Sequence, residues 1–134
     1  MNLPLFTLSF ALFTAAWLYF LQARVIMLRR GNKIAFGDGD NKALRGWIRA
    51  HANALENLLP FTMLALIYEL VFGSGIVLAV FMLAMAAARV AHPWGLIAPR
   101  KFMSTRVIGM AATLAVSGLF ILWTLVRLLA KLFA

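Results

Sequence analysis

The chain has 134 residues, of which 64% are hydrophobic and only 13% are charged. Typical soluble domains carry about twice that share of charged residues, and a chain this short has too little interior to bury so much apolar surface. The composition therefore excludes an ordinary soluble domain and indicates a protein whose solvent is the lipid bilayer.

The net charge of +9 does not by itself indicate a nucleic-acid-binding protein. The 13 lysines and arginines lie between apolar segments, as in the loops of a membrane protein, and no nucleic-acid recognition motif accompanies them. Cysteine is absent, so any thiol chemistry would need a thiol that a substrate brings. His51 and His92 are the only histidines and have no third ligand at a useful spacing, so we predict no metal site.

Four apolar segments approach the length of about 20 residues that a helix needs to cross a bilayer. We expect transmembrane helices at about residues 3–23, 44–72, 76–91 and 107–126. A basic loop is expected at about 24–43 and a tight turn at 72–75. A third connection is expected at about 92–106, where Pro93, Gly95 and Pro99 should stop the preceding helix. The sequence thus predicts one all-α membrane domain, residues 1–134, built as a four-helix bundle.

The distribution of charge between the connections predicts the orientation. Eleven of the 13 basic residues lie in or beside the two long connections, and only Arg127 and Lys131 lie on the opposite side. Because cytoplasmic loops carry an excess of lysine and arginine, we place both long connections in the cytoplasm and both termini outside.

The second helix carries an unusual stripe of polar residues. At 100° per residue, Arg49, Asn53, Glu56 and Pro60 fall within a sector of about 60°. Too few residues follow Glu56 to span the bilayer without it, so its carboxylate should lie within or just beneath the cytoplasmic interface. A charge near mid-bilayer costs about 2.5–3.5 kcal/mol, so Glu56 should face a protein interior or a polar cavity that contains a cation.

Two interpretations of this stripe remain open. Glu56 could form a purely structural ion pair with Arg49 or Arg89. Alternatively, the surplus of arginines, together with Asn53 and His92, could bind an anionic ligand. Arg89 and His92 are three residues apart near the end of the third helix, hence on one face, although an interfacial arginine and a helix-end histidine are the simpler readings of that pair.

The pattern of Arg49, Asn53 and Glu56, followed closely by Pro60, resembles the signature of the MAPEG superfamily, the membrane-associated proteins in eicosanoid and glutathione metabolism. Arg24 near the end of the first helix and the pair Arg89 and His92 closing the third are also similar to positions of that family. The resemblance is closest to small uncharacterised bacterial members. The tyrosines that eicosanoid-forming members have near the thiol are missing, with Asn57 and Leu96 in this region instead.

The resemblance implies a homotrimer that binds glutathione at each subunit boundary near the cytoplasmic face. Arg24 and Arg49 would then pair with the glutathione carboxylates, and Asn53 and Glu56 would hold its polar backbone or amino group. Residues at the ends of the third and fourth helices would complete the site. Arg89 and His92 would orient glutathione or close the pocket, and Arg106, opening the fourth helix, would stabilise the thiolate as the catalytic residue.

The resemblance implies a glutathione transferase or peroxidase of the bacterial inner membrane, with glutathione as co-substrate and no metal. It would act on hydrophobic electrophiles that enter from the bilayer. The alternative from another class is a non-catalytic membrane scaffold or a lipid- or ligand-binding protein on the same fold. A transporter is disfavoured because no pair of broken helices is present.

Overall fold

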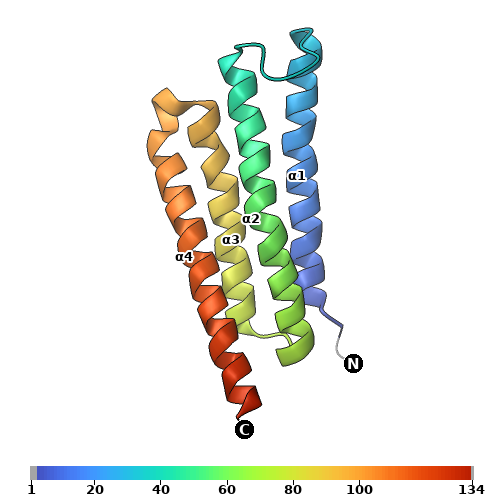
Figure 1. The fold of residues 1–134 in the computed structure, drawn as a ribbon, viewed down its shortest axis with the longest axis vertical. Coiled ribbons are helices and arrows are strands. Elements are labelled where there is room, and N and C mark those ends of the chain that lie inside the picture. The colour runs from blue at the N-terminus through green and yellow to red at the C-terminus, as the bar shows by residue number, and fades with distance from the viewer. Residues whose placement is uncertain (1–2, 134) are drawn as a thin grey trace.

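The computed structural model describes residues 3–133, except for the side chains of residues 99–103. It contains four α-helices: α1 (Leu5–Gly31), α2 (Lys42–Phe72), α3 (Ile76–Ile97) and α4 (Pro99–Leu132). They run alternately up and down, so that both ends of the chain lie at the same end of the bundle (Figure 1). α2 packs between α1 and α3, and α4 packs mainly against α3.

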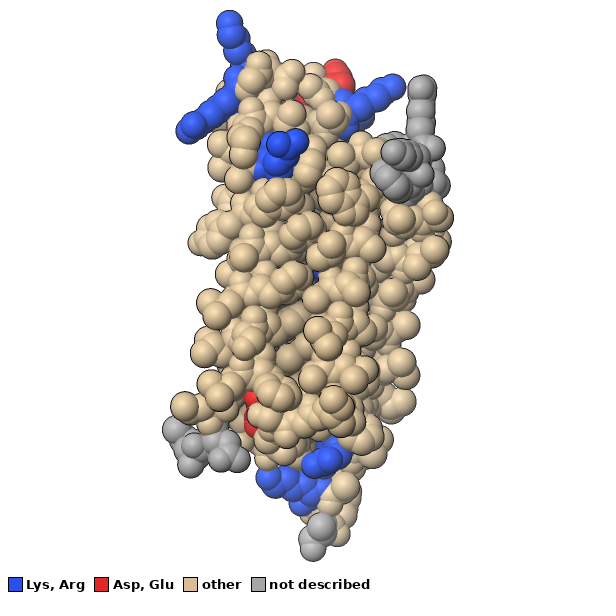
Figure 2. Space-filling model, turned by 180° about the vertical axis from the view of Figure 1, so that it is seen from behind, with Lys and Arg blue, Asp and Glu red and all other residues tan. Residues whose placement is uncertain are grey.

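All four helices are long and apolar enough to cross a membrane. Their outward faces are covered by large apolar side chains, among them Leu12, Leu59, Leu83 and Ile121, each more than half exposed. Figure 2 shows the molecule from behind, with most of the visible charged side chains at the two ends and a surface almost free of charge between them. The prediction of a four-helix bundle with four membrane-spanning helices is confirmed.

The interior of the bundle is held by aromatic and methionine side chains. Phe61 of α2 lies with its ring centroid 5.1 Å from that of Phe120 of α4, and Phe10 of α1 approaches Phe61 to 5.4 Å. Met82 and Met85 of α3 are buried beside these rings. Because lipid is as apolar as these side chains, such packing rather than water exclusion holds membrane helices together.

A buried carboxylate ties α1 to α2 near the chain termini. Glu69 of α2, only 3% exposed, accepts hydrogen bonds from the main-chain N–H groups of Phe6 (3.1 Å) and Thr7 (2.7 Å). The hydroxyl of Ser74 donates a third, at 2.6 Å. The first N–H groups of a helix have no partner within it and favour a negative charge, so Glu69 acts as a cap that α2 supplies to α1.

The predicted turn between the second and third helices is confirmed, since α2 ends at Phe72 and α3 begins at Ile76. Gly73 has a φ of 80°, a left-handed conformation that glycine adopts without strain. The loop between α1 and α2 also contains left-handed glycines, Gly37 and Gly39. There, Arg45 pairs with Asp38 and thereby holds the pKa of that carboxyl below its usual value.

Two predicted connections are much shorter than expected. The first helix continues past residue 23 to Gly31. The expected loop at 92–106 is wrong: α3 runs through Pro93 to Ile97, and α4 begins at Pro99, so only Ala98 separates them. Proline removes a single helical hydrogen bond, which does not end a helix that neighbouring helices support, and at the first position of α4 its missing N–H has no cost.

Two glycines allow the C-terminal part of α3, residues 92–97, to pack closely against α2 and α4. A Cβ added to Gly46 of α2 would lie 2.7 Å from the main-chain oxygen of Leu96. A Cβ added to Gly109 of α4 would lie 2.9 Å from both Cα and Cβ of His92. The end of α3 is therefore held between the backbones of α2 and α4, close to the polar stripe of α2.

Candidate functional site

A cleft of about 650 Å³ opens between α2 and α4, beside the C-terminal part of α3. Its size is typical of sites for small organic ligands. It lies toward the end of the bundle opposite the chain termini. The residues that line it are Arg49, Ala52, Asn53, Glu56, His92, Leu96, Arg106, Val107, Met110, Ala111 and Leu114.

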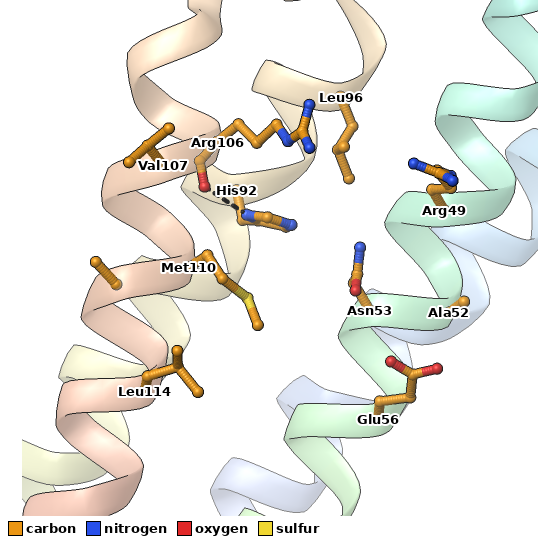
Figure 3. Close-up of a pocket in the computed structure, with 11 residues that line it drawn as sticks. Arg49, Ala52, Asn53, Glu56, His92, Leu96, Arg106, Val107, Met110 and Leu114 are labelled. Carbon is orange, nitrogen blue, oxygen red and sulfur yellow. Dashed lines mark hydrogen bonds between the residues drawn. The ribbon is translucent and has the colours of Figure 1, made fainter.

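The wall formed by α2 carries the predicted polar stripe. Arg49, Asn53 and Glu56 all line the cleft, as their helical spacing required (Figure 3). Arg49 and Glu56 are exposed in the single chain, while Asn53 is half-buried. One face of one helix thus presents a cation, an amide and a carboxylate to the same space.

The opposite wall is formed by the ends of α3 and α4. The Nδ1 atom of His92 lies 3.0 Å from the main-chain oxygen of Arg106, and the Arg106 side chain extends from α4 toward the cleft (Figure 3). His92 is 4% exposed, and its Nε2 atom has no hydrogen-bond partner among the described residues. The imidazole therefore offers an unused nitrogen at a wall of the cleft.

Arg89 lies behind the cleft rather than in it. Its side chain is 1% exposed, and its Nη2 atom donates to the main-chain oxygen of Gly109 at 3.0 Å. Its Nη1 atom lies 3.5 Å from the main-chain oxygen of Asn53, at the limit of a hydrogen bond. Arg89 of α3 thus connects the α2 wall to the α4 wall and fixes their separation.

Arg24 also lies outside the cleft. It is exposed on α1, and its guanidinium carbon sits 4.9 Å from the centroid of the Trp47 ring. Of the seven predicted site residues, the single chain therefore brings five to the cleft: Arg49, Asn53, Glu56, His92 and Arg106.

The ion pair considered for Glu56 is not formed. Within residues 3–133, leaving aside the undescribed side chains, the ion pairs join Arg45 to Asp38 and to Asp40. Arg49 lies seven residues from Glu56, about 10 Å along the helix, and Arg89 is engaged with main-chain oxygens. The Glu56 carboxylate consequently remains available in the cleft.

The expected position of Arg106 in its helix also needs correction. Because α4 begins at Pro99, Arg106 lies about two turns inside the helix and not in its first turn. The electrostatic effect of a helix end falls off within one turn, so the positive end of α4 does not assist this arginine. Any effect of Arg106 on a ligand must come from its own charge.

Apolar residues of α4 complete the cleft, and sequence reasoning did not single them out. Val107, Met110 and Leu114 are separated by three and four residues and so share one face of α4, and this periodicity was the signal for them. Below the cleft, a second hollow of about 210 Å³ shares Glu56 and Leu114 with it. The rest of its lining is mainly apolar: Asn57, Pro60, Phe61, Leu64, Ser117 and Ile121.

The space between α2 and α4 therefore changes character along its length. Arg49 and Arg106 stand at the polar end, Glu56 lies where the two hollows meet, and apolar side chains line the remainder. Among the described residues no group of three histidine, aspartate or glutamate side chains is arranged to hold a metal ion. The arrangement suits a charged ligand at one end and an apolar one at the other.

Comparison with known proteins identifies the family. The model of the MAPEG family matches residues 7–126, nearly the whole chain and all four helices. No curated protein and no solved structure gives a significant match. With this match and four helices able to span a membrane, the chain belongs to the MAPEG family of multi-pass membrane proteins, which is associated with glutathione.

Proposed function

We propose that this protein is a membrane-bound glutathione transferase or glutathione-dependent peroxidase that acts on lipophilic electrophiles. The observation that carries the proposal is the convergence of Arg49, Asn53 and Glu56 with His92 and Arg106 around one cleft. Glutathione has two carboxylates, one ammonium group and a thiol. A site for it needs cations, an anion and an amide partner, and this cleft presents two arginines, one glutamate and one asparagine.

All the charged and polar groups of the ligand except one carboxylate have a partner of matching chemistry in the cleft. Arg49 is suited to a carboxylate, since a guanidinium binds carboxylates with two parallel hydrogen bonds. Glu56, which has no cation beside it, is suited to the ammonium group. Asn53 and the free Nε2 atom of His92 are suited to the peptide groups of the ligand.

Arg106 is assigned the catalytic role. An ordinary thiol has a pKa of about 8.5, and a neighbouring guanidinium in a partly dry site lowers it toward neutrality. Lowering that pKa to about 7 requires roughly 2 kcal/mol, which one arginine can supply. The side chain of Arg106 extends toward the cleft from α4, and the apolar Met110 and Leu114 lie below it.

The apolar hollow below the cleft is assigned to the second substrate. A lipophilic electrophile would enter from the bilayer between α2 and α4, pass Leu114, which lines both hollows, and meet the sulfur beside Arg106. In the transferase reaction the thiolate forms a C–S bond while the leaving group departs with its electron pair. In the peroxidase reaction two glutathiones reduce an organic hydroperoxide to the alcohol and water and become a disulfide.

The exposure of Glu56 supports assembly into a homotrimer with a site at each subunit boundary. Glu56 lies 16 residues, about 24 Å, from the end of α2 at Phe72, so a hydrocarbon core of about 30 Å that begins there would still include it, and contact with lipid would be costly. A neighbouring α1 packed over the open side of the cleft would cover it. Arg24 of the same chain lies outside the cleft, so the exposed Arg24 of such a neighbour would take that place in the site.

The location proposed is the bacterial inner membrane, with the termini outside and the cleft facing the cytoplasm, where glutathione is made. The up-and-down fold fits this orientation, because the cleft lies toward the end with the two basic connections.

The alternative function is a non-catalytic scaffold or lipid- or ligand-binding protein that uses the same cleft. The missing tyrosines favour it, since Leu96 lines the cleft where an aromatic hydroxyl would otherwise assist the thiol.

Turnover separates the two functions. Purified protein in detergent would be mixed with glutathione and an apolar aryl halide, and conjugate formation would be followed. Saturable conjugation that is lost in Arg106→Gln and kept in Arg127→Gln supports the transferase. A similar assay with an organic hydroperoxide tests the peroxidase. Binding of glutathione without turnover of either substrate would establish the scaffold function instead.

A further inference from the structure

The end of α1 that faces the α1–α2 loop carries a basic hollow separate from the cleft. Residues Ile26, Arg29, Arg30, Lys33, Ile34 and Ala35 enclose a space of about 330 Å³ there. Lys33 has a φ of 54°, which turns the chain back so that the N–H of Ile34 donates to the oxygen of Arg29 at 3.0 Å. This turn brings Ile34 and Ala35 alongside the last turn of α1.

The three cations of this hollow form no ion pair with an acidic side chain that the structure describes. The chain has four acidic residues. Asp38 and Asp40 pair with Arg45, and Glu69 caps α1 near the chain termini. The fourth, Glu56, lies in the cleft between α2 and α4. Arg29, Arg30 and Lys33 are thus left to repel one another, which an anion in the hollow would relieve.

The geometry of the hollow favours a phosphate. Arg29 and Arg30 lie in the last turn of α1, Lys33 follows directly after the helix, and all three residues line one space. The Nε atom of Arg29 is shielded from solvent and has no hydrogen-bond partner among the described residues. The negative end of the α1 dipole opposes an anion, but its last carbonyls already accept hydrogen bonds, from the main chain of Asn32, Lys33 and Ile34 and the side chain of Asn32.

The surroundings indicate that the phosphate belongs to a lipid. α1 is a candidate membrane span that ends at Gly31, so the hollow lies where a helix leaves the bilayer. Ile26 and Met27, 43% and 57% exposed, provide an apolar surface directly below it. Phe36, 90% exposed, stands in the following loop, where aromatic residues commonly insert among headgroups.

We propose that this hollow is a binding site for the headgroup of an anionic phospholipid. The phosphate would lie between Arg30 and Lys33 and accept from the Nε atom of Arg29, while one acyl chain would follow Ile26 along α1. Clusters of basic residues beside a transmembrane helix commonly attract anionic lipids. The site is independent of the proposed glutathione chemistry.

Native mass spectrometry of the purified full chain tests this proposal. Dioleoylphosphatidylglycerol and dioleoylphosphatidylcholine would be added at equal concentrations, and the bound lipid counted. The test variant is Arg30→Gln/Lys33→Gln. The matched control is Arg127→Gln/Lys131→Gln, which removes the same charge from the other end of the bundle, where Arg127 and Lys131 lie on the Phe72 ring. All four side chains are exposed, so neither variant disturbs the core.

We expect the wild-type protein to prefer phosphatidylglycerol, and the test variant to lose on the order of tenfold in affinity for it. The control should keep its preference. Equal losses in the two variants, a loss confined to Arg106→Gln, or no preference for the anionic lipid would overturn the proposal. Binding of glycerol phosphate as tightly as the lipid would show a soluble phosphate site and also contradict it.

A second measurement needs no variant. Phosphatidylglycerol with a photoreactive group next to its phosphate would be cross-linked to the wild-type protein, and the labelled peptide identified by mass spectrometry. Labelling within residues 26–36 supports the site. Labelling spread over both ends of the bundle contradicts it.

Discussion

The Nδ1 atom of His92 lies 3.0 Å from the main-chain oxygen of Arg106, which joins α3 to α4 at the wall of the cleft. This contact orients the imidazole so that its Nε2 atom is left for a ligand. It also places His92, which was predicted to orient glutathione or close the pocket, beside Arg106, which we propose stabilises the thiolate. The contact depends on the close approach of α3 to Gly109.

Replacing His92 by phenylalanine should weaken glutathione binding more than it weakens the fold. The ring packing is retained, but both ring nitrogens are lost, so we expect a loss in affinity of roughly tenfold and a loss in stability of about 1 kcal/mol. Isothermal titration and thermal unfolding in detergent measure the two effects. His51→Phe is the control, because His51 does not line the cleft. Equal binding by the two variants would contradict the role of His92.

Adding a methyl group at Gly109 should separate α3 from α4. In Gly109→Ala the new Cβ would lie 2.9 Å from His92, and relieving that contact should cost about 1–3 kcal/mol. Gly118→Ala on the same helix has open space around it and should be neutral or slightly stabilising. Thermal unfolding in detergent compares the two. A Gly109→Ala variant as stable as Gly118→Ala would show that the helices do not approach so closely.

Glu69 and Glu56 are the two acidic residues of α2, and removing each of them singly should affect a different property of the protein. Glu69→Gln weakens the cap on α1 and should destabilise the protein by about 1–3 kcal/mol, with little change in glutathione affinity because the site is at the other end. Glu56→Gln should leave stability unchanged or improve it, and should reduce glutathione affinity. Thermal unfolding measures the stability of both variants, and titration calorimetry measures their affinity for glutathione. Loss of binding in Glu69→Gln at a temperature where it is folded would contradict this division.

Arg89 should behave as a structural residue and not as a ligand contact. In Arg89→Lys the ammonium group cannot reach the oxygens of both Gly109 and Asn53 as the guanidinium fork does, so we expect a loss of about 1–2 kcal/mol in stability. Arg49→Lys, on the exposed cleft wall, should keep its stability and lose glutathione affinity. Unfolding and titration of both variants check this. Direct contact of Arg89 with glutathione in a complex structure would contradict it.

Much of the fold was predictable because helical periodicity and apolar length are local properties. They fixed the number of helices, the turn at 72–75 and the shared face of Arg49, Asn53 and Glu56. The boundary between α3 and α4 was predicted wrongly from the prolines. Whether a helix continues past Pro93 depends on its packing against α2 and α4. That packing comes from Gly46 and Gly109, whose importance appears only when distant segments meet.

The candidate site was less predictable than the fold for the same reason. Sequence spacing cannot tell that Arg89 turns away from the cleft toward two main-chain oxygens, or that Glu56 stays unpaired. Nor does it distinguish a residue such as Arg24, which a neighbouring subunit would have to supply, from one that the same chain brings to the cleft.

The formation of glutathione thiolate on the purified protein tests the central claim most directly. Ultraviolet difference absorbance would be followed while the wild-type protein and the variants Arg106→Gln and Arg127→Gln are titrated with glutathione at neutral pH. We predict a saturable thiolate signal in the wild type and in Arg127→Gln and its loss in Arg106→Gln. A signal of equal size in Arg106→Gln, or no binding of glutathione by the wild type, would contradict the account.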